Sequence, residues 1–244
     1  MKNRHFRLIN LNLVILIFLS FSCEKIDTNY NNEDIVVKSQ EIPAYTDESS
    51  RSIQKQCVVV PCKLYVKGGM PVHENGDYSF SIPEGSEILE GLVLDSQTGV
   101  IYPVKKHLKL KEGPVEFAVK VTDGTKSYTT RCILNPQLPG RSALPAFQFN
   151  SPETNLISKS GSGYFAASFS VMGGNPPYTF SLDEKQPLPG KLSLNPQTGV
   201  IAGDISKLEP GKYQFRLICT DADSKRAISY CTGTNYEDFN LIIK

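Results

Sequence analysis

A ten-residue segment occurs twice in this chain, at positions 92–101 and again 100 residues later at 192–201. The first copy reads LVLDSQTGVI and the second reads LSLNPQTGVI. Neighbouring blocks match as well: 66–69 resembles 171–174 at an offset of 105, 78–82 resembles 178–182 at an offset of 100, and 117–123 resembles 215–221 at an offset of 98. A repeat at a nearly fixed spacing indicates one structural unit made twice. The spacing changes fall between the matching blocks, where loops accept insertions.

The matching blocks have the residue period of β-strands. Apolar residues occupy every second position of 213–219 and of 165–171. A period of two predicts strands that bury one face and turn the other towards solvent. Gly, Pro, Asn and Asp cluster between the blocks, as turns require. No segment after the N-terminal region shows a helical stripe, so the sequence predicts an all-β fold of β-sandwiches.

The repeated segment itself predicts a hairpin. Residues 92–94 and 100–101 are apolar, and the polar stretch Asp-Ser-Gln-Thr-Gly lies between them at 95–99. Such a short polar stretch between two strands is typical of a tight turn. We expect Gly99 and its counterpart Gly199 to supply the positive φ that closes each turn.

The second copy carries the motifs of a known family. Pro-Pro-Tyr at 176–178, Leu-Pro-Gly-Lys-Leu at 188–192, Thr-Gly-Val-Ile-Ala-Gly at 198–203 and Gly-Lys-Tyr at 211–213 resemble bacterial putative-Ig modules. These modules are cadherin-like, immunoglobulin-like domains of surface proteins. The first copy has Tyr-Pro at 102–103 where the family has Ala-Gly. The resemblance implies two tandem Ig-like (cadherin-like) β-sandwiches, but no single activity, because this fold serves many functions.

The N-terminus resembles a secretion signal. Lys2, Arg4 and Arg7 precede a short apolar core at 13–19, which is too short for a comfortable transmembrane helix. Leu-Ser-Phe-Ser-Cys at 19–23 resembles a loose lipobox of the kind common in Bacteroidetes, although Phe21 departs from the usual small residue. The resemblance implies cleavage before Cys23, lipidation of Cys23, and anchoring in the outer membrane on its periplasmic or cell-surface side. The alternative is ordinary signal cleavage, with no role for Cys23.

These observations divide the chain into four parts. We expect a signal peptide at 1–22, a flexible tether at 23–52, one Ig-like domain at 53–136 and a second at 137–244. The tether follows from the polar composition of its ends, which offers little to bury. The whole chain has 26 Lys+Arg and 25 Asp+Glu, and three of the basic residues leave with the signal. The mature chain is therefore close to neutral and has no basic footprint for nucleic acid.

Five cysteines follow Cys23, and a secreted protein can form disulfides. One candidate bridge joins Cys219 to Cys231, which flank the last turn. The other joins Cys57 or Cys62 to Cys132, which would tie the first strands of the first domain to its last strand. The alternative is that these cysteines are small buried apolar side chains. An odd count leaves at least one thiol unpaired.

Three aspartates are candidate metal ligands. Cadherin relatives bind calcium with acidic residues at domain junctions, so the resemblance makes Asp123, Asp221 and Asp223 candidates for Ca²⁺. The alternative is a turn role, because Asp123-Gly124 is a hairpin signal and aspartates often accept bonds from turn N–H groups. Ca²⁺ needs six or more oxygens and the sequence shows no full set. We expect no other cofactor and no catalytic residues, since no nucleophile–base or carboxylate pair stands out.

The sequence therefore predicts a membrane-anchored, non-catalytic surface lipoprotein that acts in adhesion, display or assembly with a protein or glycan partner. A glycan-binding accessory of a polysaccharide-uptake system is the alternative, and a hydrolase is the third reading. A cluster of exposed aromatic residues would favour glycan binding, and an unpaired edge strand would favour protein partnering. Function is expected where the copies differ, at 70–77, at 102–112 and at the Cys-bracketed end of the second domain.

Overall fold

The computed structural model describes residues 34–46, 56–71, 77–105, 108–109, 113–137, 147–159, 162–222 and 234–244. Within these ranges every regular element is a β-strand. None of them contains a helix that could cross a membrane. The all-β prediction is confirmed. We call the part up to Gln137 the N-terminal copy and the part from Phe147 the C-terminal copy.

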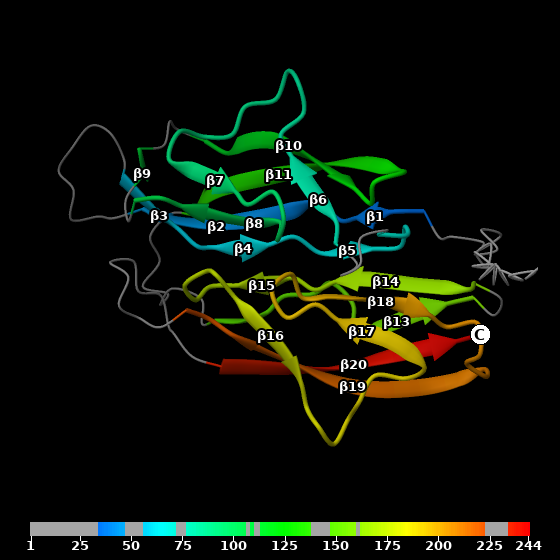
Figure 1. The fold of residues 1–244 in the computed structure, drawn as a ribbon. Helices are drawn as coiled ribbons and strands as arrows, with labels where there is room; N and C mark the ends of the chain where they lie inside the picture. Colours follow the sequence, from blue (N-terminus) through cyan, green and yellow to red (C-terminus); the bar gives the residue numbers. More distant parts are fainter. Residues whose placement is uncertain are drawn as a thin grey trace, which may run out of the picture.

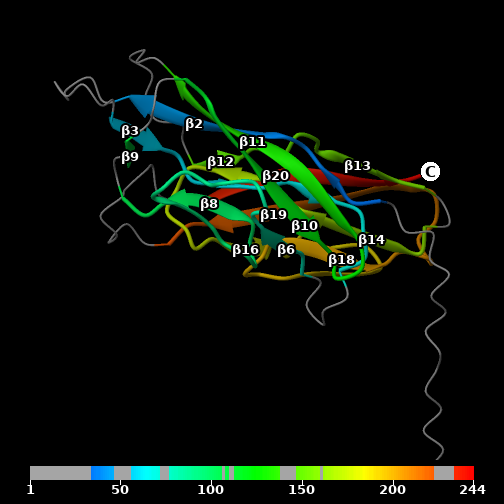
Figure 2. The ribbon, with the colours of Figure 1, turned by 90° about the horizontal axis from the view of Figure 1, so that it is seen from above.

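The strands form three stacked layers (Figure 1). The upper layer is a sheet of the N-terminal copy in the order β6 (Ser79–Ser81), β10 (Val115–Thr122), β11 (Ser127–Gln137), β2 (Gln40–Thr46), β3 (Gln56–Val59) and β9 (Leu108–Lys109). The lower layer is a sheet of the C-terminal copy in the order β13 (Asn155–Ser158), β20 (Thr234–Ile243), β19 (Gly211–Thr220) and β16 (Thr179–Leu182). Figure 2 looks down through the layers and shows β2, β10 and β11 above β19 and β20.

Both copies contribute strands to the middle layer. One run has the order β1 (Val36–Val37), β5 (Val66–Lys67), β14 (Tyr164–Ser168), β18 (Val200–Asp204) and β17 (Lys191–Leu194). The other has the order β12 (Gln148–Phe149), β15 (Val171–Met172), β4 (Cys62–Lys63), β8 (Val100–Pro103) and β7 (Leu92–Leu94). Because β4 leads directly into β5 and β14 into β15, the two runs form one shared layer.

The copies join through these two segments, which pair antiparallel. Cys62 lies opposite Met172, and Val66 lies opposite Ser168. At one end the Gly68 N–H donates to the Ala166 carbonyl at 2.9 Å, and at the other the Gly173 N–H donates to the Pro61 carbonyl at 2.9 Å. Gly173 and Ala166 are the counterparts of Gly68 and Pro61 at the repeat offset of 105. The join is therefore approximately two-fold symmetric.

The two faces of the shared layer border two different cores. Leu64 and Val66 belong to the upper core, whereas Tyr65 between them belongs to the lower core. In the C-terminal copy, Ala166 belongs to the upper core and Ala167 to the lower. Each copy thus completes the hydrophobic core of the other, and alternate residues of one strand serve opposite cores.

The predicted alternation is confirmed in one strand and wrong in another. In β19 the side chains of Phe215, Leu217 and Cys219 are buried, and the residues between them are partly exposed. In β14 and its continuation to Val171, both alternating sets are buried except for Tyr164 at the strand's start. The reason is that β19 belongs to an outer sheet with one solvent face, whereas β14 is covered on both faces.

The hairpin prediction is confirmed in both copies. Gly99 has φ +69° and Gly199 has φ +66°. A β-carbon at Gly99 would lie 2.6 Å from the Phe80 ring, and one at Gly199 would lie 2.8 Å from the Phe180 ring. Glycine is thus required at each position both by the backbone and by a close aromatic ring.

The predicted tether is wrong for its middle part. Residues 36–37 form β1 and residues 40–46 form β2, and Ile35, Val37, Ile42 and Ala44 are buried in the upper core. β2 pairs in parallel with β11 over six residue pairs, from Gln40 opposite Cys132 to Tyr45 opposite Gln137. The first domain therefore begins by Asp34 rather than at 53. Figure 1 shows that β1 and the C-terminus lie at the same end of the molecule.

Candidate functional site

A pocket of about 260 Å³ lies where the two copies meet. The hairpin of the N-terminal copy forms one wall, and the loop before β16 of the C-terminal copy forms another. Its lining residues are Lys63, Asp95, Thr98, Val100, Tyr102, Pro176, Pro177, Tyr178, Phe180 and Gln197. Asp95, Thr98, Tyr102 and Gln197 are partly or fully exposed, so polar groups are accessible at its mouth.

Lys63 is fully buried beside this pocket. Its Nζ donates to Ser168 Oγ and lies 5.9 Å from the centre of the Phe180 ring. Burial lowers the pKa of the Lys63 amine to about 7, although Cys219, Cys62 and Asp95 act in the opposite direction. None of the described carboxylates forms an ion pair with it. Lys63 is thus a buried amine without a bonded counter-charge at the centre of the join.

The symmetric counterpart of this pocket is filled. Asp77, from the longer loop of the N-terminal copy, accepts hydrogen bonds from Asn195 Nδ2 at 2.8 Å and Thr198 Oγ1 at 3.0 Å. Asn195 and Thr198 correspond to Asp95 and Thr98 in the repeat. Thr198 is consequently only 5% exposed, whereas Thr98 is partly exposed. The Asp77 carboxylate thus occupies the place beside the C-terminal hairpin, whereas the equivalent place beside the N-terminal hairpin is the open pocket.

A second candidate site lies on the outer face of the lower sheet. Tyr236 on β20 is 61% exposed, and the Arg216 guanidinium lies 4.7 Å from its ring centre. Asp238 accepts from Arg216 Nε at 2.7 Å and from Nη2 at 3.0 Å, and Asp183 lies 3.6 Å from Nη1. The bonds from Arg216 lower the pKa of the Asp238 carboxyl. The bidentate contact fixes the guanidinium plane, and the plane supports the exposed ring.

The predicted bridge between Cys62 and Cys132 is absent. Cys62, Cys132 and Cys219 are all free and buried. Burial raises the pKa of the Cys62 thiol and of the Cys132 thiol to about 12, and that of the Cys219 thiol further. These thiols therefore pack as small apolar side chains and are poor nucleophiles, which matches the stated alternative. Cys219 is not bridged, and its proposed partner Cys231 lies outside the described residues.

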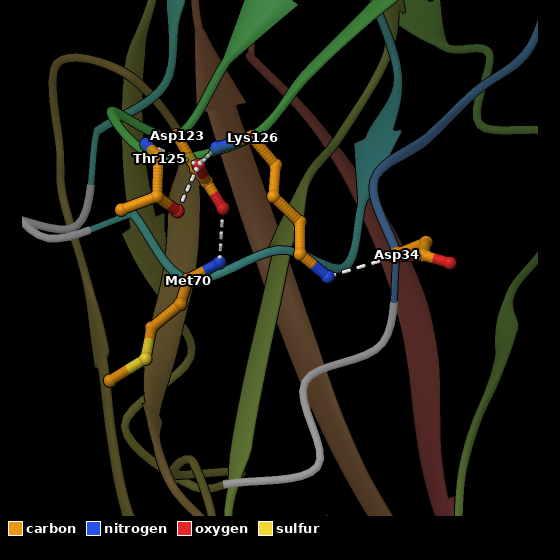
Figure 3. A network of polar contacts seen from close by, with 5 residues as sticks. All are labelled: Asp34, Met70, Asp123, Thr125 and Lys126. Atoms are coloured by element: carbon orange, nitrogen blue, oxygen red, sulfur yellow. Dashed lines mark hydrogen bonds and ion pairs between the residues drawn. The ribbon is translucent and has the colours of Figure 1, made fainter. Parts of the chain in front are cut away.

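Asp123 acts as a turn acceptor (Figure 3). Its Oδ2 accepts from the Met70 N–H at 2.7 Å, and its Oδ1 accepts from the N–H groups of Thr125 at 2.9 Å and Lys126 at 2.6 Å. Burial raises the pKa of this carboxyl, but the hydrogen bonds outweigh burial and leave it lowered. Lys126 also pairs with Asp34 at 2.8 Å, which fastens the start of the N-terminal copy to this turn.

The matching aspartate has the matching contact. Asp221 Oδ2 accepts from the Asn175 N–H at 2.8 Å, and Asn175 is the counterpart of Met70 at the offset of 105. Asp223, Cys23 and the signal segment lie outside the described residues. Within the described part of the chain, no three acidic, cysteine or histidine side chains gather as a metal site would require. Ca²⁺ binding stays an untested expectation.

Sequence reasoning missed Lys63 and Asp95, and it included Asp77 only as part of the stretch 70–77, where the copies differ. Lys63 could have been noticed from its position within the apolar run from Val58 to Val66. A run with so few polar residues indicates a strand buried on both faces, so a lysine within it is expected to be buried. Asp95 could be found only by comparing the copies, because Asn195 replaces it in the second hairpin. The pocket depends on the pairing of the copies, which no local pattern reveals.

A protein-family model matches part of the chain. Residues 139–235 match the family model described as "Putative Ig domain". This match covers less than half of the chain, namely the C-terminal copy up to the start of β20, and agrees with the sandwich that the strands form. The search of curated proteins found no match.

The solved structures that match include fragments of a protocadherin, a cadherin and a receptor phosphatase. A mouse clustered protocadherin fragment of extracellular domains 1–3 is 12% identical over 88% of this chain and 68% of that chain, with a TM-score of 0.28. Drosophila N-cadherin domains 1–4 are 13% identical over 86% and 51%, with a TM-score of 0.29. The Ig1–2 module of the Drosophila receptor phosphatase DLAR is 12% identical over 86% and 98%, with a TM-score of 0.26. These scores are too low to support an argument, so the fold assignment rests on the sheets and the family match.

Proposed function

We propose that the protein is a lipid-anchored, non-catalytic module of the bacterial outer membrane that adheres to or assembles with a macromolecular partner. The observation that carries the proposal is the supported tyrosine on the outer face of the lower sheet. Tyrosine and arginine are the residues most enriched among those that dominate protein interfaces. Because Arg216 already holds the Tyr236 ring, little side-chain freedom is lost when a partner covers it.

The partner is expected to meet a sheet face rather than a strand edge. The Phe80 N–H on the edge strand β6 donates to the Ser96 carbonyl at 2.9 Å, and the Phe180 N–H on β16 donates to the Pro196 carbonyl at 2.8 Å. The hairpin turns thus occupy a donor on each of these edges, which discourages strand addition. The exposed tyrosines Tyr128 and Tyr236 lie on opposite outer sheets, so they form no shared aromatic patch.

Replacing Tyr236 by alanine should weaken adhesion about tenfold or more, as the loss of a dominant interface side chain does. Beads coated with residues 24–244 would be counted on intact cells of the producing bacterium and on beads that carry the same protein. Tyr128→Ala is the matched control, because Tyr128 is also exposed but lies on the upper sheet. Equal binding by wild type and Tyr236→Ala, or no binding by wild type, would contradict the proposal.

Replacing Cys23 by alanine should release the protein from the membrane. Acyl chains attached to Cys23 would supply the attachment, since the near-neutral mature chain offers no electrostatic one. Fractionation of cells should move the variant from the membrane to the soluble fraction. Unchanged membrane retention would refute lipidation.

A glycan-binding accessory role is the second candidate function. The open pocket between the copies favours it, because Tyr102 and two prolines line it together with accessible Asp95, Thr98 and Gln197. Apolar walls with a few polar groups are the usual composition of a small-ligand site.

A further inference from the structure

The open pocket and its filled counterpart differ at three equivalent places. Asp95 stands where the C-terminal copy has Asn195, Tyr102 where it has Ala202, and Lys63 where it has Ser168. The N-terminal copy also has five more residues between Gly69 and Tyr78 than the C-terminal copy has between Gly174 and Tyr178, since the repeat offset falls from 105 to 100 across this stretch. The open pocket therefore has a carboxylate, an amine and an aromatic ring at positions where its counterpart has an amide, a hydroxyl and a methyl group.

The polar atoms at the pocket mouth have unused bonding capacity. Asp95 Oδ1 accepts from the N–H groups of Gln97 and Thr98, both at 2.9 Å. Among the described residues, no donor reaches Asp95 Oδ2 and no acceptor takes the Thr98 hydroxyl proton. In the counterpart, the Thr198 hydroxyl donates to Asp77, and Asn195 Nδ2, a donor that a carboxylate lacks, donates to Asp77 as well. The open pocket thus offers a charged acceptor and a hydroxyl to an incoming ligand.

The charges around the pocket exclude most charged ligands. A cation would lie beside the buried Lys63 amine, and an anion would lie against the Asp95 carboxylate. A neutral ligand with several hydroxyls avoids both penalties, and its hydroxyls donate to Asp95 in a charge-assisted bond. The cavity of about 260 Å³ corresponds to about eight or nine waters at ~30 Å³ each, which suits one small ring.

We propose that this pocket binds one neutral sugar ring, with its hydroxyls on Asp95 and Thr98 and its C–H face against Tyr102. Tyr102 is partly exposed and packs on the lower core, so its ring is held in place. The buried Phe180 ring closes the floor beside Lys63. The ring is either a free monosaccharide or the end of a glycan chain.

Saturation-transfer NMR on soluble residues 24–244 tests the proposal. Glucose, galactose, mannose and N-acetylglucosamine would be titrated singly at millimolar concentration, with galacturonate and glucosamine as charged counterparts. At least one neutral sugar should bind, and the charged forms should bind more weakly. Asp95→Asn and Tyr102→Ala place at each position the residue type that the C-terminal copy already tolerates, and each should lower affinity about tenfold or more.

Gln97→Ala is the matched control, because Gln97 is exposed on the same turn but does not line the pocket. Two-dimensional NMR spectra establish that each variant is folded. The inference is overturned if no neutral sugar binds, if charged sugars bind equally well, or if Asp95→Asn and Tyr102→Ala bind like wild type.

Oligosaccharides that end in the bound sugar separate the two sources. Binding of both forms identifies the end of a glycan, and binding of the monosaccharide alone identifies a free sugar; either result supports the pocket. The inference rests on the second candidate function and needs neither the anchor nor a protein partner. Its failure would therefore leave the results for Tyr236 and Cys23 standing.

Discussion

A fragment of residues 139–244 produced alone is expected to remain unfolded or to aggregate, although it spans the whole family match. Without the N-terminal copy, the face of the shared layer that carries Ala166, Val200 and Ala202 would be exposed, and all three are at most 5% exposed in the intact protein. The fragment would also lose Tyr65 and Val100 from its own core. A fold that loses one covering layer and part of its core has little apolar burial left to offset chain entropy.

Circular dichroism and two-dimensional NMR would report the state of the fragment. Residues 24–138 and 139–244 produced together as two chains are the control, and they should assemble into a soluble complex with the spectrum of the intact protein. A cooperative thermal transition and dispersed resonances from the isolated fragment would show that the shared layer is dispensable.

Tyr65 contributes much of the stabilisation that the N-terminal copy gives to the core of the C-terminal copy. Tyr65 is 2% exposed, lies in the lower core, and donates to Glu153 Oε1 at 2.7 Å. Large aromatic-to-alanine changes in cores cost about 3–5 kcal/mol. Tyr65→Ala should thus destabilise the C-terminal copy from a position in the N-terminal copy, and the whole protein should still unfold in one transition.

Replacing Lys63 by methionine is expected to stabilise the protein by about 1–4 kcal/mol at neutral pH, the range found when buried charges give way to apolar residues of similar volume. Lys63 is fully buried, and among the described residues its amine donates only to the Ser168 hydroxyl. Chemical denaturation would measure the change. Lys67→Met is the control, because Lys67 lies on the same segment but bonds the Ile157 carbonyl at the surface, so its loss should matter little.

The effect of Lys63 should also depend on pH. Burial lowers the pKa of its amine from 10.5 to about 7, so the folded protein releases this proton at a lower pH than the unfolded chain. Between pH 7 and 10.5 only the unfolded chain holds the proton, and stability therefore rises with pH across that window. Because the folded amine is already half deprotonated at pH 7, the advantage of Lys63→Met should shrink by about 2 kcal/mol between pH 7 and 9, at about 1.4 kcal/mol per pKa unit. Parallel pH profiles for the two proteins would rule out this account.

Local features of the sequence predicted local features of the fold. The hairpins around Gly99 and Gly199 depend on a few adjacent residues and a positive φ. They can therefore be predicted from either copy alone, and the repeat supports the prediction. The alternation in β19 was also predictable, because that strand has one face in solvent and one face in the core.

Long-range pairing was not predictable in the same way. Residues 34–46 resemble a tether because four polar residues separate the short apolar run at 35–37 from Ile42, and the strands that pair with this segment, β5, β3 and β11, follow later in the chain. The small residues Ala166, Ala167 and Ser168 are a signal of a strand buried on both faces, which the prediction of one solvent face for 165–171 did not use. That signal does not identify which strands cover the second face, so the pocket between the copies could not be predicted.

The parallel pairing of β2 with β11 has a mechanical consequence. In the proposed function the anchor precedes β2 in the chain, and the partner binds the C-terminal copy, which follows β11. Tension between such an anchor and such a partner would pull these two strands along their length in opposite directions. The six residue pairs between them then bear the load together in shear, whereas the strands of a hairpin pulled at its open end separate one pair at a time. The strand once assigned to the tether is the part of the molecule best placed to resist force.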